Sequence, residues 1–162
     1  MAPRILIVDD DPDIVELLRL GLTDAGYSAH TAGTGKEALQ KAKRSPPDLV
    51  VLDLLLPEMN GFSVCQHLRR NPATAAIPIL MITVLPGQFP RLVGVETGAN
   101  AYLNKPFRME ELVSYVGELL RQPGAASEIL AAPLGSPATG SFPACPAAPP
   151  SPGTFFRPGA QV

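Results

Sequence analysis

Five short apolar runs, each followed by an amphipathic stretch, limit the folds open to this chain more than any other feature. The runs lie at residues 4–8, 27–31, 49–52, 77–82 and 101–103, and each has the length of a β-strand. Helices are predicted after them, from Pro12 to a stop at Gly26 and over 35–44, 61–70, 89–97 and 108–121. Five strand–helix units in succession indicate an α/β protein with a parallel sheet covered by helices on both faces.

Local signals mark the starts and ends of these helices. Asp11 is predicted to serve only as the N-cap of the first helix. Pro12 takes the first helical position, and this pair is favoured at helix starts. Thr34 and Glu37 have the spacing of a capping box, in which each side chain accepts a hydrogen bond from a backbone N–H. The prolines after Ser45 end that second helix. Short-range chemistry therefore predicts where the helices lie.

The composition changes near Gln122. Pro, Gly, Ala or Ser fill 27 of the 40 positions in residues 123–162, and only Glu128 and Arg157 are charged there. Proline removes backbone donors, and so few large apolar groups cannot offset the entropy lost on ordering. We therefore predict one domain over residues 1–122 and a disordered or loosely docked tail over 123–162, with no built-in output domain.

Charge and cysteine usage narrow the function classes. The net charge of −2 gives no electrostatic case for direct binding to nucleic acid or to an anionic membrane. No apolar run approaches the roughly 20 residues of a membrane span. Cys65 and Cys145 form neither a disulfide framework nor a metal-ligand pattern, which is typical of a cytoplasmic protein.

Polar residues follow four of the five predicted strands. Asp9 and Asp10 come after the first strand, Asp53 after the third, Thr83 after the fourth and Lys105 after the fifth. Working groups of an open parallel sheet lie at the carboxyl ends of its strands, so these side chains are expected at one edge. Taken singly, each could be a helix cap, a loop residue or a solvated charge. Together they predict a site with three carboxylates, one hydroxyl and one ammonium.

Such a site has a definite chemistry. Clustered carboxylates repel one another and would take up protons unless a cation neutralised them. An all-oxygen ligand set favours a hard ion, and Mg²⁺ is the usual one. A carboxylate beside Mg²⁺ is a competent nucleophile toward phosphorus, and a lysine and a hydroxyl stabilise the phosphoryl oxygens. The residues therefore indicate phosphoryl transfer to an aspartate.

The same residues resemble those of a known family. Ile5–Asp11 and Asp53–Gly61, with Thr83 and Lys105–Phe107, are similar to the signature of response-regulator receiver domains in two-component signalling. The separations, 30 residues from Asp53 to Thr83 and 22 from Thr83 to Lys105, are common in that family. The resemblance spans residues 4–121. It implies a flavodoxin-like (βα)5 fold, a doubly wound parallel sheet with strand order 2-1-3-4-5.

The resemblance also implies the roles of the site residues. Asp53 would be the phosphoacceptor, and Lys105 would pair with the phosphoryl group, its bond to Pro106 being cis. Thr83 would move toward the phosphate. Tyr102 would rotate inward behind it, although simple packing between strand and helix is the other reading of this side chain.

The implied metal is Mg²⁺. Asp10 and Asp53 would ligate it, Asp9 would act mainly through a metal-bound water, and the backbone carbonyl of Leu55 would be a further ligand. The remaining positions of that site would be filled by water, as is usual for this ion.

The implied function is signalling rather than metabolism. A histidine kinase or phosphotransfer protein would deliver the phosphoryl group. The modified domain would change its affinity for a downstream effector protein through helix 4, strand 5 and helix 5, roughly residues 89–121. It would be no enzyme in the ordinary sense, since it would catalyse only its own phosphorylation and dephosphorylation. A monomer or a phosphorylation-dependent dimer is expected.

Some positions depart from the family pattern. Val84 stands where a small residue commonly follows the Thr, and Asn100 and Ala101 replace an acidic pair frequent in regulators that dimerise through this face. Leu55 and Leu85, two residues beyond Asp53 and Thr83, are apolar and cannot orient a water. The resemblance therefore predicts slow loss of the phosphoryl group.

Two rival functions are weighed against this one. A haloacid-dehalogenase-type phosphatase also uses Asp, Mg²⁺ and Lys, but it needs a second Asp two residues after the nucleophile, where this chain has Leu55. A phosphorylation-independent receiver-like interaction module is the stronger rival. Such modules normally lose a pocket residue, whereas all five are present here.

Overall fold

The computed structural model describes residues 1–84 and 98–121. The chain divides into two units, Met1–Ala132 and Pro133–Val162, and the second lies wholly outside the described residues. The predicted helix over 89–97 and the predicted tail also lie outside the described residues. The domain boundary at residue 122 therefore stays a prediction.

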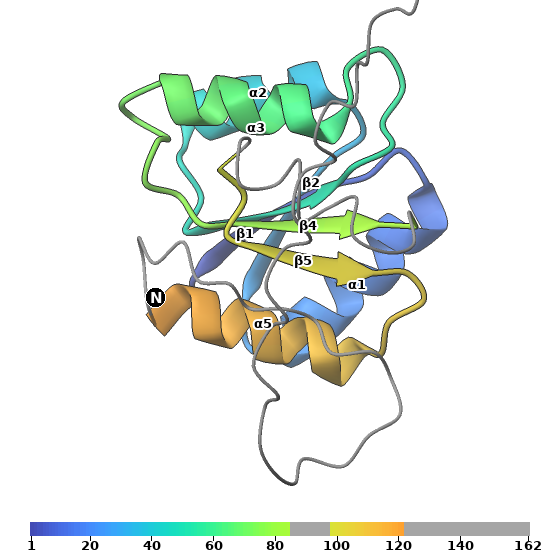
Figure 1. The fold of residues 1–162 in the computed structure, drawn as a ribbon. Helices are drawn as coiled ribbons and strands as arrows, with labels where there is room; N and C mark the ends of the chain where they lie inside the picture. Colours follow the sequence, from blue (N-terminus) through green and yellow to red (C-terminus); the bar gives the residue numbers. More distant parts are fainter. Residues whose placement is uncertain (85–97, 122–162) are drawn as a thin grey trace, which may run out of the picture. The chain divides into compact units, whose positions relative to one another are not determined.

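The described part is built on a parallel sheet of five strands in the order β2-β1-β3-β4-β5, as expected (Figure 1). The strands are β1 (Arg4–Val8), β2 (Ser28–Ala32), β3 (Leu49–Asp53), β4 (Ile79–Thr83) and β5 (Ala101–Asn104). Every pair of neighbouring strands runs parallel. The strand order changes direction between β1 and β3, which is where an open α/β sheet forms a crevice at its carboxyl edge.

Helices cover both faces of this sheet. They are α1 (Pro12–Asp24), α2 (Gly35–Arg44), α3 (Gly61–Arg70) and α5 (Met109–Arg121). Figure 1 shows α2 and α3 on one side of the sheet and α1 and α5 on the other. Two clusters of buried apolar side chains fill the space between the layers, one against α2 and α3 and one against α1 and α5.

The central strands explain the near-continuous apolar runs. All five residues of β3 and of β4 are buried. Alternate residues of β3 point to opposite faces, so that Val50 and Leu52 join the cluster under α2 and α3, while Leu49 and Val51 join the other. A strand buried on both faces can carry no polar residue until its end, and in β3 that residue is Asp53.

The predicted caps are present. The side chain of Asp11 accepts a hydrogen bond from the backbone N–H of Asp13 at 2.9 Å. Thr34 accepts one from the N–H of Glu37 at 3.2 Å, and the carboxylate of Glu37 reaches back to the N–H of Gly33 at 2.9 Å. The second contact is one residue before the cap itself, so the pair is a near relative of the predicted capping box.

Strand boundaries differ from the prediction by one or two residues, for physical reasons. The second strand begins at Ser28, because the N–H of Tyr27 still bonds to Leu22 at the end of α1. The fourth begins at Ile79, because Pro78 has no N–H and that of Ile77 bonds to Thr74. Among the described residues, no helix is long and apolar enough to cross a membrane.

Candidate functional site

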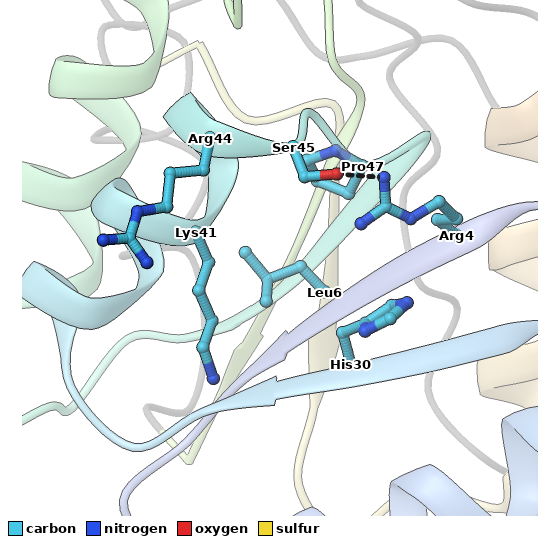
Figure 2. A pocket seen from close by; sticks show the side chains of 7 residues that line it. All are labelled: Arg4, Leu6, His30, Lys41, Arg44, Ser45 and Pro47. Carbon is cyan, nitrogen blue, oxygen red and sulfur yellow. Dashed lines mark hydrogen bonds between the residues drawn. The ribbon is translucent and has the colours of Figure 1, made fainter.

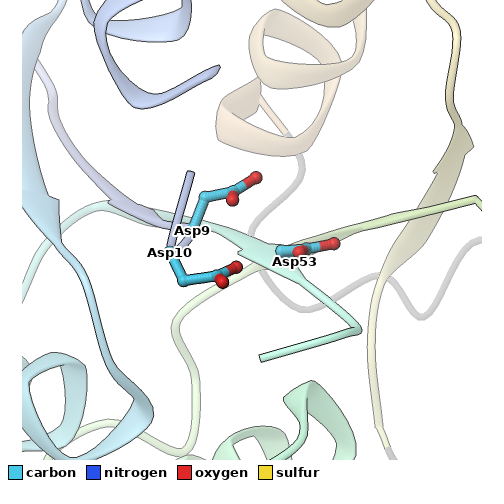
Figure 3. A group of neighbouring side chains, drawn as sticks. All are labelled: Asp9, Asp10 and Asp53. Carbon is cyan, nitrogen blue, oxygen red and sulfur yellow. The ribbon is translucent and has the colours of Figure 1, made fainter. Parts of the chain in front are cut away.

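Three carboxylates meet at the carboxyl ends of β1 and β3. Asp9 and Asp10 follow β1 directly, and Asp53 is the last residue of β3, its neighbour in the sheet. Their carboxylate oxygens lie within 4.8 Å of one another, and Figure 3 shows the three side chains grouped at these strand ends. Asp9 and Asp53 are buried, at 2% and 6% exposure, while Asp10 is open to solvent. The expected convergence of these residues is therefore found.

Lys105, which follows β5, reaches this cluster from the far side of β4. Its Nζ lies 3.1 Å from Asp9 Oδ2 and 3.5 Å from Asp53 Oδ1, and its side chain is only 19% exposed. Its backbone N–H bonds to the carbonyl of Thr83 at 2.7 Å, and its bond to Pro106 is cis, as predicted. The ammonium thus lies between the two buried carboxylates.

Both carboxylate oxygens of Asp9 accept hydrogen bonds. Its Oδ1 accepts a hydrogen bond from the N–H of Asp11 at 2.9 Å, and its own N–H bonds to the carbonyl of Ala32 at 3.2 Å. With Lys105 on the other carboxylate oxygen, the group is fixed from both sides. Asp11 itself serves the cap and lies outside the cluster, as predicted.

The charges in the cluster do not balance. Three carboxylates face one ammonium, and burial, followed by the charge of Asp9, raises the pKa of Asp53 above its ordinary value. Lys105 and the backbone N–H of Leu55 work in the opposite direction, but they do not cancel these effects. A group of oxygen donors with excess negative charge suits a hard divalent cation, so the residues present fit a metal of that kind.

Thr83 and Tyr102 lie along the neighbouring strands. Thr83 ends β4 and is fully buried, one residue beyond Ile82, which is paired with Asp53. Tyr102 lies in β5 opposite Met81 and packs, half-buried, against the cluster under α2 and α3. The two residues therefore lie on the strands between Asp53 and Lys105, while their switch roles stay predictions.

The sequence reasoning missed the part played by Gly61 in shaping the site. A Cβ on Gly61 would lie 2.5 Å from the carbonyl oxygen of Asp53 and 2.9 Å from the Cα of Leu54. The N–H of Gly61 bonds to the carbonyl of Leu54 at 2.9 Å, and the side chain of Asn60 caps α3. The start of α3 therefore presses directly on the backbone of the central aspartate. The pair Asn60-Gly61 was the available signal.

A second missed feature is a set of hydrogen bonds from Arg69 of α3 to the segments that precede β4 and β5, at the opposite end of the strands from the carboxylates. The guanidinium of Arg69 donates to the carbonyls of Ala75 and Ile77, to that of Gly98, and to the side-chain oxygen of Asn100 at 2.7 Å. The same oxygen of Asn100 accepts the N–H of Ile79 at 2.9 Å. Asn100, singled out because it replaces an acidic residue, thus has a structural task. No local pattern indicates it.

Comparison with known proteins gives a family. The model of the response regulator receiver domain matches residues 5–117. The DNA-binding dual master transcriptional regulator RpaA of Synechocystis is 47% identical over 134 residues, which are 79% of this chain and 56% of that protein. The alkaline phosphatase synthesis transcriptional regulatory protein PhoP of Bacillus subtilis is 43% identical over 122 residues, 75% of this chain and 50% of that one. The chain spans about half the length of these curated relatives.

Solved structures agree with the fold. A putative response regulator from Chloroflexus aurantiacus superposes with a TM-score of 0.72 at 41% identity, over 75% of this chain and all of that one. The chemotaxis protein CheY4 of Vibrio cholerae gives a TM-score of 0.70 at 33% identity, over 73% of this chain and 98% of that one. The flavodoxin-like fold is therefore confirmed.

One expectation needs correction. The net charge of −2 predicts no direct binding to nucleic acid, yet RpaA and the regulator MtrA of Mycolicibacterium smegmatis are named as DNA-binding proteins. The expectation is wrong because net charge describes only the residues counted, and the match covers about half of each relative. The matched residues, the strand order and the relatives agree on one assignment. The chain belongs to the response regulator receiver family of two-component signalling.

Proposed function

We propose that Asp53 is the phosphoacceptor of this receiver. A carboxylate oxygen of Asp53 attacks the phosphorus of the donor, the bond from phosphorus to the histidine nitrogen of the donor breaks, and an acyl phosphate forms on Asp53. The observation that carries the proposal is the cluster itself, in which Lys105 lies within 3.5 Å of Asp53 among three carboxylates. The donor would be a histidine kinase or a phosphotransfer protein.

A divalent cation, Mg²⁺, would be held by the carboxylates of Asp10 and Asp53 and by the backbone carbonyl of Leu55, with Asp9 acting mainly through a metal-bound water. When bound, it supplies positive charge that stabilises the phosphoryl oxygens. Two groups of the chain itself also act on the Asp53 carboxylate. Lys105 balances part of the charge beside Asp53, and the N–H of Leu55 orients the Asp53 carboxylate.

The effect of phosphorylation would be transmitted through β4 and β5, the strands beside β3. Thr83 would donate its hydroxyl to a phosphoryl oxygen, and Tyr102, one strand further, would turn inward behind it. The altered face would be helix 4, β5 and α5, of which residues 98–121 are described. The relatives are named as transcriptional regulators, so control of transcription is the output we propose. A cytoplasmic location and a phosphorylation-dependent dimer remain predictions.

The modified state should be long-lived. Leu55 lies two residues beyond Asp53 and is 51% exposed, and Val84, which follows Thr83 and adds bulk, is 53% exposed. Leu85, two residues beyond Thr83, lies outside the described residues. None of these three apolar side chains can accept or donate a hydrogen bond to orient a water for attack on the acyl phosphate. We therefore expect self-dephosphorylation over minutes or longer. Release of phosphate from purified, phosphorylated protein measures this, and a lifetime of seconds would contradict it.

Intact-mass measurement after incubation with acetyl phosphate and Mg²⁺ tests the proposed acceptor. One phosphoryl group should be added per chain, with none on Asp53→Asn or in EDTA. Asp24→Asn, which removes an exposed aspartate at the end of α1, should be modified like the wild type. Full modification of Asp53→Asn would refute the assignment. Multiple turnover of acetyl phosphate would favour a phosphatase, and no modification would favour the phosphorylation-independent interaction module.

A further inference from the structure

A pocket lies at the opposite end of the sheet from the carboxylate cluster of Asp9, Asp10 and Asp53. It has a volume of about 230 Å³ and is lined at the start of β1, on β2 and at the end of α2 (Figure 2). Arg4, the first residue of β1, lies on its wall, whereas Asp9 follows the last residue of that strand. A molecule in this pocket would therefore leave the carboxylate cluster open.

The floor of the pocket is apolar. Leu6, which is 3% exposed, lies opposite His30 in the register of β1 and β2, so both side chains project from the same face of the sheet. Pro47 adds a second buried apolar surface. Figure 2 shows Leu6 between Lys41 and Arg4, with the imidazole of His30 beside it. This floor suits a small apolar group.

The rim is cationic. Arg4 and Arg44 form no ion pair within residues 1–84 and 98–121. Arg4 donates one hydrogen bond to the hydroxyl of Ser45, which leaves further donors of its guanidinium for a ligand. Lys41 is different, because it pairs with Glu37 at 2.6 Å and donates to the carbonyl of Thr31 at 2.5 Å. The uncompensated charge therefore comes from the two arginines.

Among the residues that the structure describes, no acidic side chain lines the pocket. The nearest acidic group in sequence, Asp48, accepts the backbone N–H of Arg4 at 2.7 Å and is not part of the wall. Cations in the last turn of α2 do stabilise the helix dipole, and this accounts for Lys43 and for part of the effect of Arg44. It does not account for Arg4, which comes from another element, or for the apolar floor between the two arginines.

We propose that this pocket binds a small organic anion, namely a carboxylate or phosphate monoester carried on a small apolar body. Guanidinium groups hold the paired oxygens of such anions through parallel N–H donors, and they recognise carboxylate and phosphate alike. The apolar body would lie on Leu6 and against the ring of His30. The receiver would thus carry a ligand site separate from its phosphorylation site.

Nuclear magnetic resonance of the ¹⁵N-labelled full chain tests this, with phenyl phosphate and, in parallel, benzoate as probes in EDTA. Saturable shifts are expected at the amides of Leu6, His30 and Ser45, with none at Asp53. Arg4→Gln and Arg44→Gln should each weaken binding by about tenfold, the usual effect of losing a charged hydrogen bond. Either probe binding in this way supports the proposal, since both present the same chemistry.

Three controls sharpen the result. Arg70→Gln removes an exposed arginine at the end of α3, outside the pocket, and should keep the wild-type affinity. Benzyl alcohol lacks the charge and inorganic phosphate lacks the apolar body, so both should bind much more weakly. The proposal is overturned if neither probe gives saturable shifts, if inorganic phosphate binds as well as phenyl phosphate, or if Arg70→Gln weakens binding as much as Arg44→Gln does.

Discussion

Replacing Asp53 by Asn removes a buried negative charge that lies beside the carboxylates of Asp9 and Asp10, and we expect the metal-free domain to become more stable. The oxygens of Asp9, Asp10 and Asp53 lie within 4.8 Å of one another, and Lys105 Nζ lies 3.5 Å from Asp53. At an effective dielectric constant of about 20, the repulsion from Asp9 is worth about 3.5 kcal/mol and the attraction to Lys105 about 4.7 kcal/mol. Burial, the largest cause of the raised pKa of Asp53, costs a charged carboxylate about 3 kcal/mol or more in addition, so removing the charge leaves a net gain of about 2 kcal/mol.

The side chain of Asn keeps the acceptor for the N–H of Leu55, so the geometry should survive the change. The gain depends on pH in a defined direction. The pKa of Asp53 is raised in the folded protein, so wild-type stability falls as pH rises from the ordinary value of 3.8 through the raised one. The advantage of the variant is therefore complete above the raised pKa, and it vanishes below about 3.8.

Denaturant unfolding in EDTA at pH 7 and again at pH 3 measures this difference, together with Asp24→Asn as a matched exposed control. A gain of about 2 kcal/mol corresponds to roughly 8 °C in melting temperature for a domain of this size. Adding Mg²⁺ should stabilise the wild type, by about 2.7 kcal/mol at a hundredfold excess over the dissociation constant, and the variant less. The reasoning fails if Asp53→Asn is no more stable in EDTA than Asp24→Asn.

Three further changes test other parts of the structure. Gly61→Ala should destabilise the domain by about 1–3 kcal/mol because its Cβ would meet the backbone of Asp53. Gly117→Ala, with its nearest contact at 3.6 Å, should be neutral or stabilising in denaturant unfolding. Asn100→Ala should lower the unfolding free energy by about 1–3 kcal/mol, because Arg69 and the backbone N–H of Ile79 lose their acceptor. Asn100→Asp keeps an acceptor oxygen and should lower it less, and equal losses for the two variants would contradict this role of Asn100. Deleting residues 126–162 should change the unfolding free energy by less than about 1 kcal/mol in calorimetry, and a larger loss would refute the predicted tail.

The elements of this fold were predictable because their signals are short in range. The caps at Asp11 and Thr34 act on residues two and three positions away, and a strand buried on both faces has to be apolar along its whole length. The placement of Asp9, Asp53 and Lys105 at one edge of the sheet also followed from the sequence, since parallel strands present their carboxyl ends at one edge.

Contacts between residues distant in the chain were decided only by the tertiary structure. Nothing in the sequence around Lys105 shows that its ammonium lies between Asp9 and Asp53, 96 and 52 positions earlier. Position 61 has no room for a Cβ because α3 packs closely on the end of β3, and the sequence does not show how close this packing is.

The same holds for the features away from the carboxylate cluster. The bond from Arg69 to Asn100 joins residues 31 positions apart, and the basic pocket brings Arg4 of β1 to the end of α2 at Arg44. Periodicity and capping depend on the nearest few residues, so the sequence alone determined the elements, their order and the edge where the site lies. Distances and clearances across the sheet depend on how the layers pack, and for that reason only the folded chain decided which side chains touch.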